Sequence, residues 1–229
     1  RDDVESRGLG DVYKRQTEAD KLPEEPLRLA IGMYGGNIDF YDIKGVADAL
    51  LKTVRIYDCD YVRTSDSDAF DEASAFHPGR SAVILKDGKA IGILGEIHPD
   101  VAENYGIEVK VYAAKLNVPE MLKLSEKEVT YKPMPKFPAT TRDLSLICDD
   151  NLPAASIEKA IKKAAGKVLE KVTLFDVYKG KQIEEGKKSI SYSISMRSHD
   201  GTLTDEQADS VMKKVLKALK DLSLIHISE

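Results

Sequence analysis

The sequence predicts an α+β fold in which two domains, each with an antiparallel sheet, follow one another along the chain. Apolar runs on either side of Asp87-Gly88 predict a β-hairpin, because an Asp-Gly pair suits a two-residue turn. After residue 130 the predicted elements follow the order strand, helix, strand, strand, helix. Between these regions, prolines at positions 133, 135 and 138 disfavour both helix and central strand. We therefore place the domain boundary near residue 130, with domains at 17–129 and 130–221.

Both ends of the chain are expected to be non-native sequence, which is set aside before fold reasoning. Residues 9–16 read LGDVYKRQ and residues 222–229 read LSLIHISE. The codons CTC GGA GAT GTG TAT AAG AGA CAG encode the first segment, and their reverse complement encodes the second. A single DNA sequence read on opposite strands thus accounts for both ends, and it resembles a transposase adapter of sequencing libraries. We expect residues 1–16 and 222–229 to be adapter-derived and the chain to be a fragment of a longer protein.

Composition indicates a globular chain. Its 229 residues are 42% hydrophobic and 32% charged, enough for one or two ordinary domains, and no apolar run approaches the length of a membrane-spanning helix. Cys59 and Cys148 form no CxxC or zinc pattern, which favours a reducing, cytosolic setting. Residues 1–129 hold 17 Lys/Arg against 25 Asp/Glu, and residues 130–229 hold 17 against 14. This small basic excess in the second half does not by itself predict nucleic-acid binding.

The first domain is expected to combine one long helix with an antiparallel sheet. Apolar residues at helical spacing, including Ile43, Ala47 and Leu51, indicate the helix. The expected elements are an extended run at 27–33, a loop at 35–37, a helix at 40–54, a hairpin at 83–94, a short helix at 99–105 and a strand at 109–116.

The second domain shows clearer boundaries. Pro153 suits the first turn of a helix and Gly166 suits the residue just past its end, while Thr204 and Gln207 have the spacing of a capping box. We expect strands at 144–148, 169–178 and 189–197, and helices at 153–165 and 204–220. One more strand would complete a β-α-β-β-α-β, ferredoxin-like unit. The native last strand falls where the native sequence stops, and we expect the apolar tail at 222–227 to imitate it.

A candidate binding surface follows from the strict alternation at 189–197. Ile190, Tyr192, Ile194 and Met196 would face the helices, which leaves the serines on the open face of the sheet. Asp176 and Tyr178 share a parity on the neighbouring strand, so we expect both to project beside these serines. Single-stranded RNA is read by such groups, because bases stack on aromatic rings and their edges form hydrogen bonds. The alternative is a plain solvated sheet face.

The remaining candidates are weaker. Consecutive Ser198-His199-Asp200 cannot converge as a catalytic triad does. The acidic segment at 66–72 lacks the glycine of a calcium loop, and Phe70 occupies a ligand position. His77 and His98 could be metal ligands, which keeps a metal-dependent hydrolase as a third hypothesis. No glycine-rich phosphate-binding motif occurs.

Several motifs, in order along the chain, resemble bacterial phenylalanine–tRNA ligase β subunits, and the resemblance covers residues 27–220. In the second half, KFPATTRDLSL, DVYKG, GKKS and TLTDE resemble signatures of the anticodon-binding domain at residues 136–146, 176–180, 186–189 and 202–206. In the first half, DFYDIKG, FHPGRS and GILGEIHP resemble the end of the catalytic-like domain at residues 39–45, 76–81 and 92–99.

This resemblance implies a partial class II synthetase-like sheet domain without an active site, followed by a ferredoxin-fold anticodon-binding domain. It further implies contacts to the first anticodon base of phenylalanine tRNA from Asp176, Tyr178 and Ser189. The partner would be a ligase α subunit in an (αβ)₂ heterotetramer, which carries the ATP, magnesium and phenylalanine chemistry. We expect a cytoplasmic protein with no membrane or DNA partner, in which this fragment is not catalytic and holds no cofactor. A stand-alone RNA-binding protein built on the same domain is the alternative.

Overall fold

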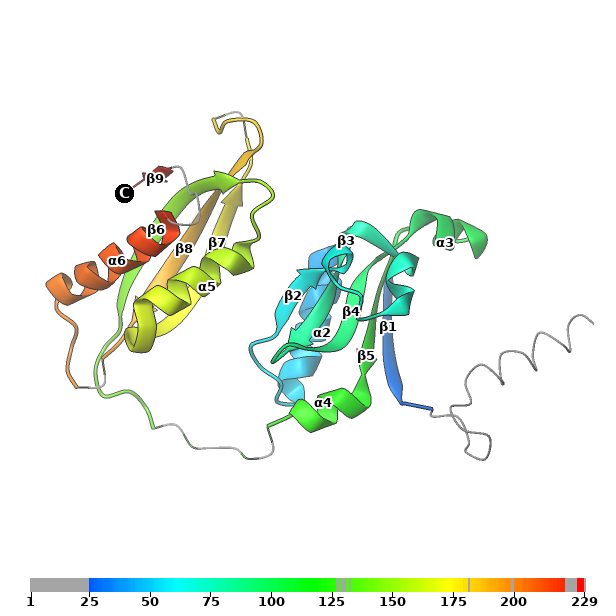
Figure 1. Ribbon diagram of the computed structural model, residues 1–229, viewed down its shortest axis with the longest axis horizontal. Helices are drawn as coiled ribbons and strands as arrows, with labels where there is room; N and C mark the ends of the chain where they lie inside the picture. Colours follow the sequence, from blue (N-terminus) through cyan, green and yellow to red (C-terminus); the bar gives the residue numbers. More distant parts are fainter. Residues whose placement is uncertain are drawn as a thin grey trace, which may run out of the picture. The chain divides into compact units, whose positions relative to one another are not determined.

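The computed structural model describes residues 25–126, 128, 131, 133–180, 182–198, 200–220 and 226–228. It separates into two compact units, Arg1–Val129 and Thr130–Glu229 (Figure 1). Each unit contains its own antiparallel sheet and its own hydrophobic core. The α+β class expected from the sequence is confirmed.

Unit 1 is built on a five-stranded sheet with the strand order β1-β5-β4-β3-β2, and every neighbouring pair is antiparallel. One 14-residue helix, two short helices, 3₁₀ turns and a hairpin turn accompany these strands. The elements are β1 (Arg28–Tyr34), α2 (Phe40–Thr53), β2 (Asp60–Arg63), η1 (Thr64–Asp66), η2 (Asp71–Ala75), β3 (Phe76–Lys86), β4 (Lys89–Ile97), α3 (Pro99–Asn104), β5 (Val111–Asn117) and α4 (Val118–Leu124).

The helix expected at 40–54 is α2, and Asp39 fixes where it begins. The Asp39 carboxylate accepts hydrogen bonds from the backbone N–H groups of Tyr41 (2.7 Å) and Asp42 (3.3 Å), and the Asp42 carboxylate accepts one from Asp39 N–H (2.7 Å). This reciprocal capping satisfies donors that the first helical turn leaves unpaired. Ile43, Ala47 and Leu51 are then buried against the sheet.

The expected hairpin is formed by β3 and β4, which pair from Lys86 and Lys89 back to Phe76 and Ile97. Asp87 and Gly88 make the turn with φ values of 51° and 76°. Two consecutive positive φ angles match the backbone twist of a two-residue hairpin turn, and Asp and Gly tolerate them well. Both strands extend beyond the residues expected from the apolar pattern alone.

A buried carboxylate joins three strands of unit 1. Glu96 is only 3% exposed, and its two oxygens accept hydrogen bonds of 2.8 and 2.7 Å from Nη1 of Arg80. The hydroxyl of Tyr112 donates to the same carboxylate at 3.1 Å. Burial raises the pKa of Glu96, but the hydrogen bonds from Arg80 and Tyr112 outweigh it and hold the pKa below its ordinary value. The cluster therefore stabilises unit 1 only while Glu96 is ionised.

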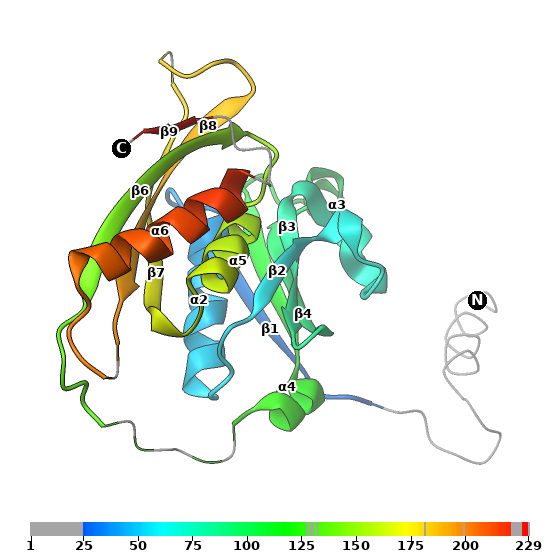
Figure 2. The same ribbon diagram turned by 60° about the vertical axis from the view of Figure 1, so that its left-hand side comes forward.

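Unit 2 is a four-stranded antiparallel sheet with the order β7-β8-β6-β9. Two helices cover one face of this sheet, as two views of the molecule show (Figures 1 and 2). The elements are β6 (Thr140–Asp149), α5 (Ala154–Ala165), η3 (Gly166–Val168), β7 (Leu169–Tyr178), β8 (Lys187–Met196), α6 (Asp205–Lys220) and β9 (His226–Ser228). This order of elements and strands is the ferredoxin-like fold expected from the sequence.

The core of unit 2 lies between the helices and alternate residues of the two central strands. Tyr192 is fully buried there, and its hydroxyl donates to the carbonyl oxygen of Ala154 at 3.1 Å. The expected alternation on β8 is thus confirmed. The buried core residues are Leu144, Leu146, Cys148, Ile157, Ile161, Ala165, Ile190, Tyr192, Ile194, Met196, Ala208, Val215 and Leu219.

The helix ends of unit 2 match the sequence signals with one correction. Thr204 and Gln207 form the expected capping box, with hydrogen bonds of 3.3 Å from Gln207 N–H to Thr204 Oγ1 and 3.0 Å from Thr204 N–H to Gln207 Oε1. Pro153 was expected in the first turn of α5, and this is wrong. Its ψ of 135° is extended, so Pro153 precedes the helix as the N-cap.

The chain also forms an edge strand next to β6. Residues 226–228 pair antiparallel with β6, with Ser228, Ile227 and His226 opposite Ser145, Leu146 and Ile147. The expectation that the tail lies as an edge strand is confirmed for residues 226 and 227, while residues 222–225 lie outside the described part of the chain. That this strand is non-native stays a prediction.

Replacing Arg80 by Ala should lower the unfolding free energy of unit 1 near neutral pH, because a buried carboxylate loses a charged donor. A group with a lowered folded-state pKa stabilises the fold above its unfolded value and loses this effect as pH falls through the folded value. The gap between variant and parent should therefore shrink in acid. Urea unfolding at about pH 7 and about pH 3 measures both. Arg63→Ala, at an exposed position, is the control and should change little.

A chain ending at residue 221 should lose protection from hydrogen exchange at the β6 amides that face β9, because the three paired residues of β9 would be gone. The β6 amides that face β8 serve as the internal control, since that pairing runs along the whole of β6. Unchanged protection at the β9-facing amides would show that the tail does not pair in solution.

Candidate nucleic-acid interface

The face of the second sheet that points away from α5 and α6 carries polar side chains from three strands. Residues directly opposite each other in antiparallel strands share a face, so the register defines this surface. Tyr178 lies opposite Ser189, and Asp176 lies opposite Ser191. We call this surface the open face. Its members on β6, β7 and β8 are Thr141, Asp143, Ser145, Ile147, Asp149, Lys171, Thr173, Asp176, Tyr178, Lys187, Ser189, Ser191, Ser193 and Ser195.

A β-bulge in β7 places Asp176 and Tyr178 on the open face. Earlier in the strand, Val172 and Leu174 lie opposite Ile194 and Tyr192 and pack against the core. Simple alternation would carry Asp176 and Tyr178 to that same, helix-covered side. The register instead shifts by one residue at Phe175, so the side chains of the residues that follow point to the opposite face of the sheet. The shared parity of Asp176 and Tyr178 was predicted correctly, but the bulge that exposes them was not.

The three site residues expected from the sequence come together at one end of the open face. Asp176 is exposed, the Tyr178 side chain is 44% exposed and Ser189 is half-buried. Within the described residues, neither the Asp176 carboxylate nor the Tyr178 and Ser189 hydroxyls have a hydrogen-bond partner. A carboxylate, a phenol and a hydroxyl are therefore available to a ligand at this end of the sheet.

The row of serines is less available than the sequence suggested. Ser191 is buried, and its hydroxyl oxygen lies 2.8 Å from that of Ser145. Ser195 donates to Glu170 at 3.4 Å, and Arg197 reaches the same carboxylate at 3.0 Å. These contacts hold the sheet surface together. Among the serines of β8, Ser189 and Ser193 keep hydroxyls without a partner within the part of the chain that the structure describes.

The loop that follows Tyr178 is fixed to the loop between β6 and α5. Lys179 forms an ion pair with Asp150 and lowers the pKa of that carboxyl. The N–H of Asp150 donates to the carbonyl oxygen of Gly186 at 2.8 Å. From β8, Nζ of Lys188 donates to the carbonyl oxygens of Asp150 (2.7 Å) and Leu152 (2.8 Å). The end of the sheet that carries Tyr178 and Ser189 is therefore held in place.

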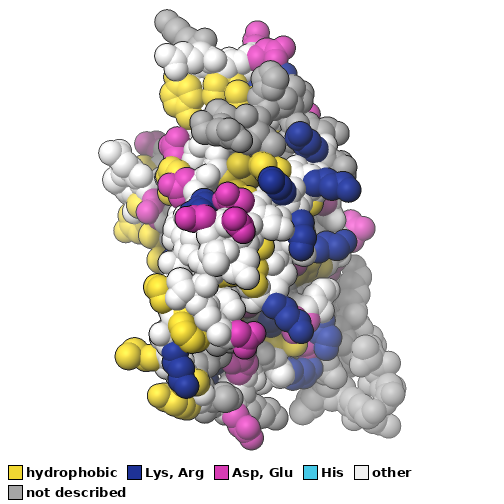
Figure 3. Space-filling model, turned by 90° about the vertical axis from the view of Figure 1, so that its left-hand side faces the viewer, with side chains coloured by type: hydrophobic (Ala, Val, Ile, Leu, Met, Phe, Trp, Pro, Cys, Tyr) yellow, Lys and Arg dark blue, Asp and Glu magenta, His cyan; other side chains and the backbone are white. Residues whose placement is uncertain are grey.

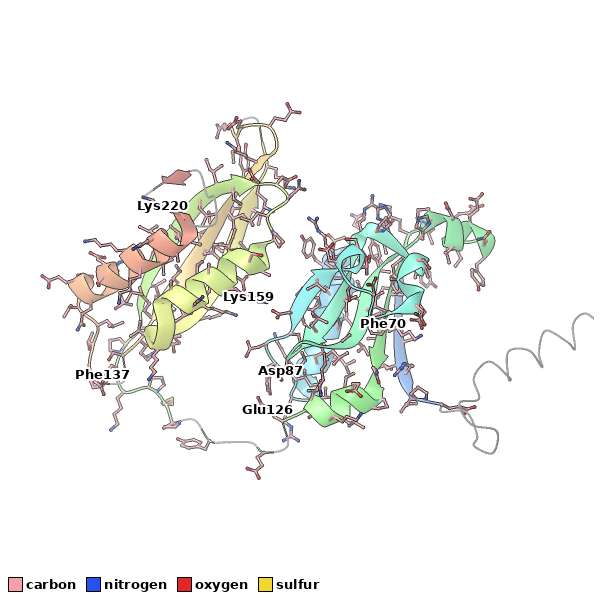
Figure 4. The ribbon with its side chains drawn as sticks, in the orientation of Figure 1. Phe70, Asp87, Glu126, Phe137, Lys159 and Lys220 are labelled. Carbon is pink, nitrogen blue, oxygen red and sulfur yellow. The ribbon has the colours of Figure 1, made fainter. Side chains whose placement is uncertain are left out.

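Positive charge lies on the helix side of unit 2. Four exposed lysines, Lys213, Lys214, Lys217 and Lys220, occupy the second half of α6. Lys and Arg side chains gather along one side of the face seen in Figure 3. Figure 4 shows Lys159 on α5 and Lys220 at the carboxyl end of α6. A polyanion would thus be attracted to the helix side, while the open face offers an aromatic ring and hydrogen-bonding groups that can contact bases.

One aromatic side chain beside the site was not anticipated. Phe175, the extra residue of the bulge, is 55% exposed. A strand ending in Leu-Phe-Asp-Val-Tyr has too many apolar residues for one buried face, and that is the signal in the sequence that could have indicated a bulge.

The metal hypothesis finds no support in the geometry. The rings of His77 and His98 stack with centroids 6.5 Å apart, and Nδ1 of each accepts a hydrogen bond from a nearby backbone N–H, of Gly79 and Asp100 respectively. Among the described residues, no three His, Cys, Asp or Glu side chains gather where they could hold a metal ion. The cavity beside His98 is lined by Thr64, Ser65, Ala73, Ser74, Phe76, Pro78 and His98, without a carboxylate.

The other segments singled out in the sequence serve local structure. In the acidic segment, Glu72 pairs with Lys115 and Asp66 accepts a hydrogen bond from Ser65. Ser198 accepts one from the N–H of Asp200 at 3.2 Å, while His199 lies outside the described residues. None of the described helices is long and apolar enough to cross a membrane.

Comparison with known proteins identifies relatives of both units. Residues 135–225 match the family model described as ferredoxin-fold anticodon binding domain, and residues 5–118 match that described as phenylalanyl tRNA synthetase beta chain CLM domain. Both matches reach into the end segments that we ascribe to adapter DNA, so the exact limits of the native sequence stay predictions.

The chain is also similar to curated phenylalanine–tRNA ligase beta subunits. It is 40% identical to that of Clostridium acetobutylicum over 212 residues and 43% identical to that of Clostridium tetani over 213 residues, in each case 93% of this chain and 26% of the relative. It is 34% identical to that of Bacillus subtilis over 232 residues, 96% of this chain and 28% of the relative. The chain thus spans about a quarter of the length of the curated relatives it matches.

Replacing Lys188 by Met should keep most of the packing of the side chain but remove the two hydrogen bonds to the Asp150 and Leu152 carbonyls. We expect the unfolding free energy of unit 2 to fall by about 1.5–3 kcal/mol, the range for hydrogen bonds from a charged donor. Chemical denaturation measures this change. Lys217→Met, on the exposed side of α6, should change it by less than about 0.5 kcal/mol. Equal effects of the two substitutions would contradict an anchoring role for Lys188.

Proposed function

Because this chain belongs to the family of phenylalanine–tRNA ligase β subunits, we propose that unit 2 binds the anticodon of phenylalanine tRNA through the open face of its sheet. The observation that carries this proposal is the convergence of Asp176, Tyr178 and Ser189 at one end of that face, without partners within the described residues. The match to an anticodon-binding domain model over residues 135–225 supports it.

Each of the three side chains has a distinct part in this proposal. The ring of Tyr178 stacks on the first anticodon base, an interaction that tolerates any base because each has a π-face. The Asp176 carboxylate only accepts hydrogen bonds when ionised, so it selects a base edge that presents N–H donors, such as that of guanine. The Ser189 hydroxyl can donate or accept and lies opposite Tyr178. Tyr178 thus supplies affinity and Asp176 supplies discrimination.

Unit 1 is proposed to be an assembly element. In the whole enzyme it is the end of a catalytic-like domain without its own active site, which packs against the α subunit in an (αβ)₂ heterotetramer in the cytoplasm. ATP, magnesium and phenylalanine would bind the α subunit, so this chain does not charge tRNA alone. Unit 1 exposes several large apolar side chains, in or beside different elements, that contact with a partner would cover: Leu27, Tyr34, Tyr41, Tyr105 and Leu122.

Binding of the full chain to an anticodon stem-loop of phenylalanine tRNA tests the site, with fluorescence anisotropy as the readout. Tyr178→Ala should weaken binding about 5- to 150-fold, the loss that corresponds to one stacked base. Tyr105→Ala is the matched control, because Tyr105 is an 80% exposed tyrosine in unit 1. It should leave the affinity unchanged.

Discrimination is tested with a loop whose first anticodon base is changed. The parent chain should prefer the original loop, and Asp176→Asn should reduce this preference, because an amide can donate as well as accept. Equal and purely salt-dependent binding to both loops would mean phosphate attraction alone. In that case the three site residues are wrongly assigned, although membership of the family would stand.

A further inference from the structure

Gly180 lies two residues after Tyr178, and the tyrosine ring occupies the space that a side chain at position 180 would need. A Cβ atom built on Gly180 would lie 2.1 Å from the hydroxyl oxygen of Tyr178, 2.3 Å from its Cζ and 2.9 Å from its Cε1. Real Cβ atoms essentially never approach another heavy atom within 3.0 Å. Gly180 does not have a positive φ, unlike Gly186 in the same loop. The absence of a side chain at Gly180 therefore leaves room for the Tyr178 ring, and the backbone conformation does not require it.

The backbone at Gly180 is held in place. Its carbonyl oxygen accepts a hydrogen bond of 2.9 Å from the N–H of Ile183, and the preceding Lys179 is paired with Asp150. The Tyr178 side chain, by contrast, is 44% exposed and has no hydrogen bond within the described residues. A side chain at position 180 would therefore move the ring and not the loop, since rotation toward solvent breaks no polar contact of Tyr178.

We infer that Gly180 is a positioning residue, which sets the orientation in which Tyr178 presents its ring to a nucleobase. This inference rests on the proposed function. With the ring tip lying over a bare backbone, Tyr178 is placed beside Asp176 and Ser189 before RNA arrives. A side chain at position 180 would exclude this orientation, so the ring would have to leave the place from which a stacked base lies within reach of the hydrogen-bonding groups.

The test compares Gly180→Ala with Gly201→Ala in the full chain, using the same anticodon stem-loop. Gly201 is the matched control, because a Cβ there meets nothing within 4 Å and its φ is not positive either. Gly180→Ala should weaken binding about 5- to 150-fold, as Tyr178→Ala does, whereas Gly201→Ala should bind like the parent. Coincident unfolding transitions of all variants establish that the loss is not one of folding.

A double-mutant cycle separates positioning from a general loop effect. In a Tyr178→Ala background, Gly180→Ala should cause no further loss, since no ring remains to be displaced. A similar loss from Gly180→Ala with and without the ring would overturn the inference and indicate a structural role of the loop. Parent-like affinity of Gly180→Ala, alongside weak binding of Tyr178→Ala, would also overturn it while leaving the proposed function intact. If Tyr178→Ala binds like the parent, the proposed function fails first, and the inference with it.

Discussion

The pairing of β8 with both β6 and β7 decides what each face of the second sheet carries. Ile190, Tyr192 and Ile194 alternate with serines, and burial of the apolar set beneath α5 and α6 fixes the register of the whole strand. A slip of one residue would bury the serines and expose the core, so this register is strongly specified. The candidate interface depends on this register, because the residues of β6 and β7 that lie opposite the serines of β8 share their face.

The interface combines this rigid scaffold with two local departures from regularity. The bulge at Phe175 turns Asp176 and Tyr178 toward the open face, and the loop after Tyr178 is tied to the loop between β6 and α5 through Asp150. Val172 and Leu174 face the core while Asp176 and Tyr178 face the open side, and only an extra residue between the two pairs allows both in one strand. Bulges next to binding sites commonly serve this purpose.

The first unit differs from the second because it buries a charged carboxylate. Its sheet buries the Glu96 carboxylate beneath Arg80 and Tyr112, a contact that depends on paired charge and not on apolar packing. Around it, side chains such as Tyr34 and Tyr105 remain exposed.

The sequence alone determined the α+β class, the β-α-β-β-α order, the Asp87-Gly88 hairpin and the capping box of α6, because each depends on residues close together in the chain. It also determined that Asp176 and Tyr178 share a face. Only the tertiary structure decided which face that is, since a bulge is defined by pairing with a strand more than ten residues away. It likewise decided that the hydroxyls of Ser191 and Ser145 form a hydrogen bond with each other, and that Gly180 makes room for Tyr178. Both depend on atoms that approach one another only after the chain has folded.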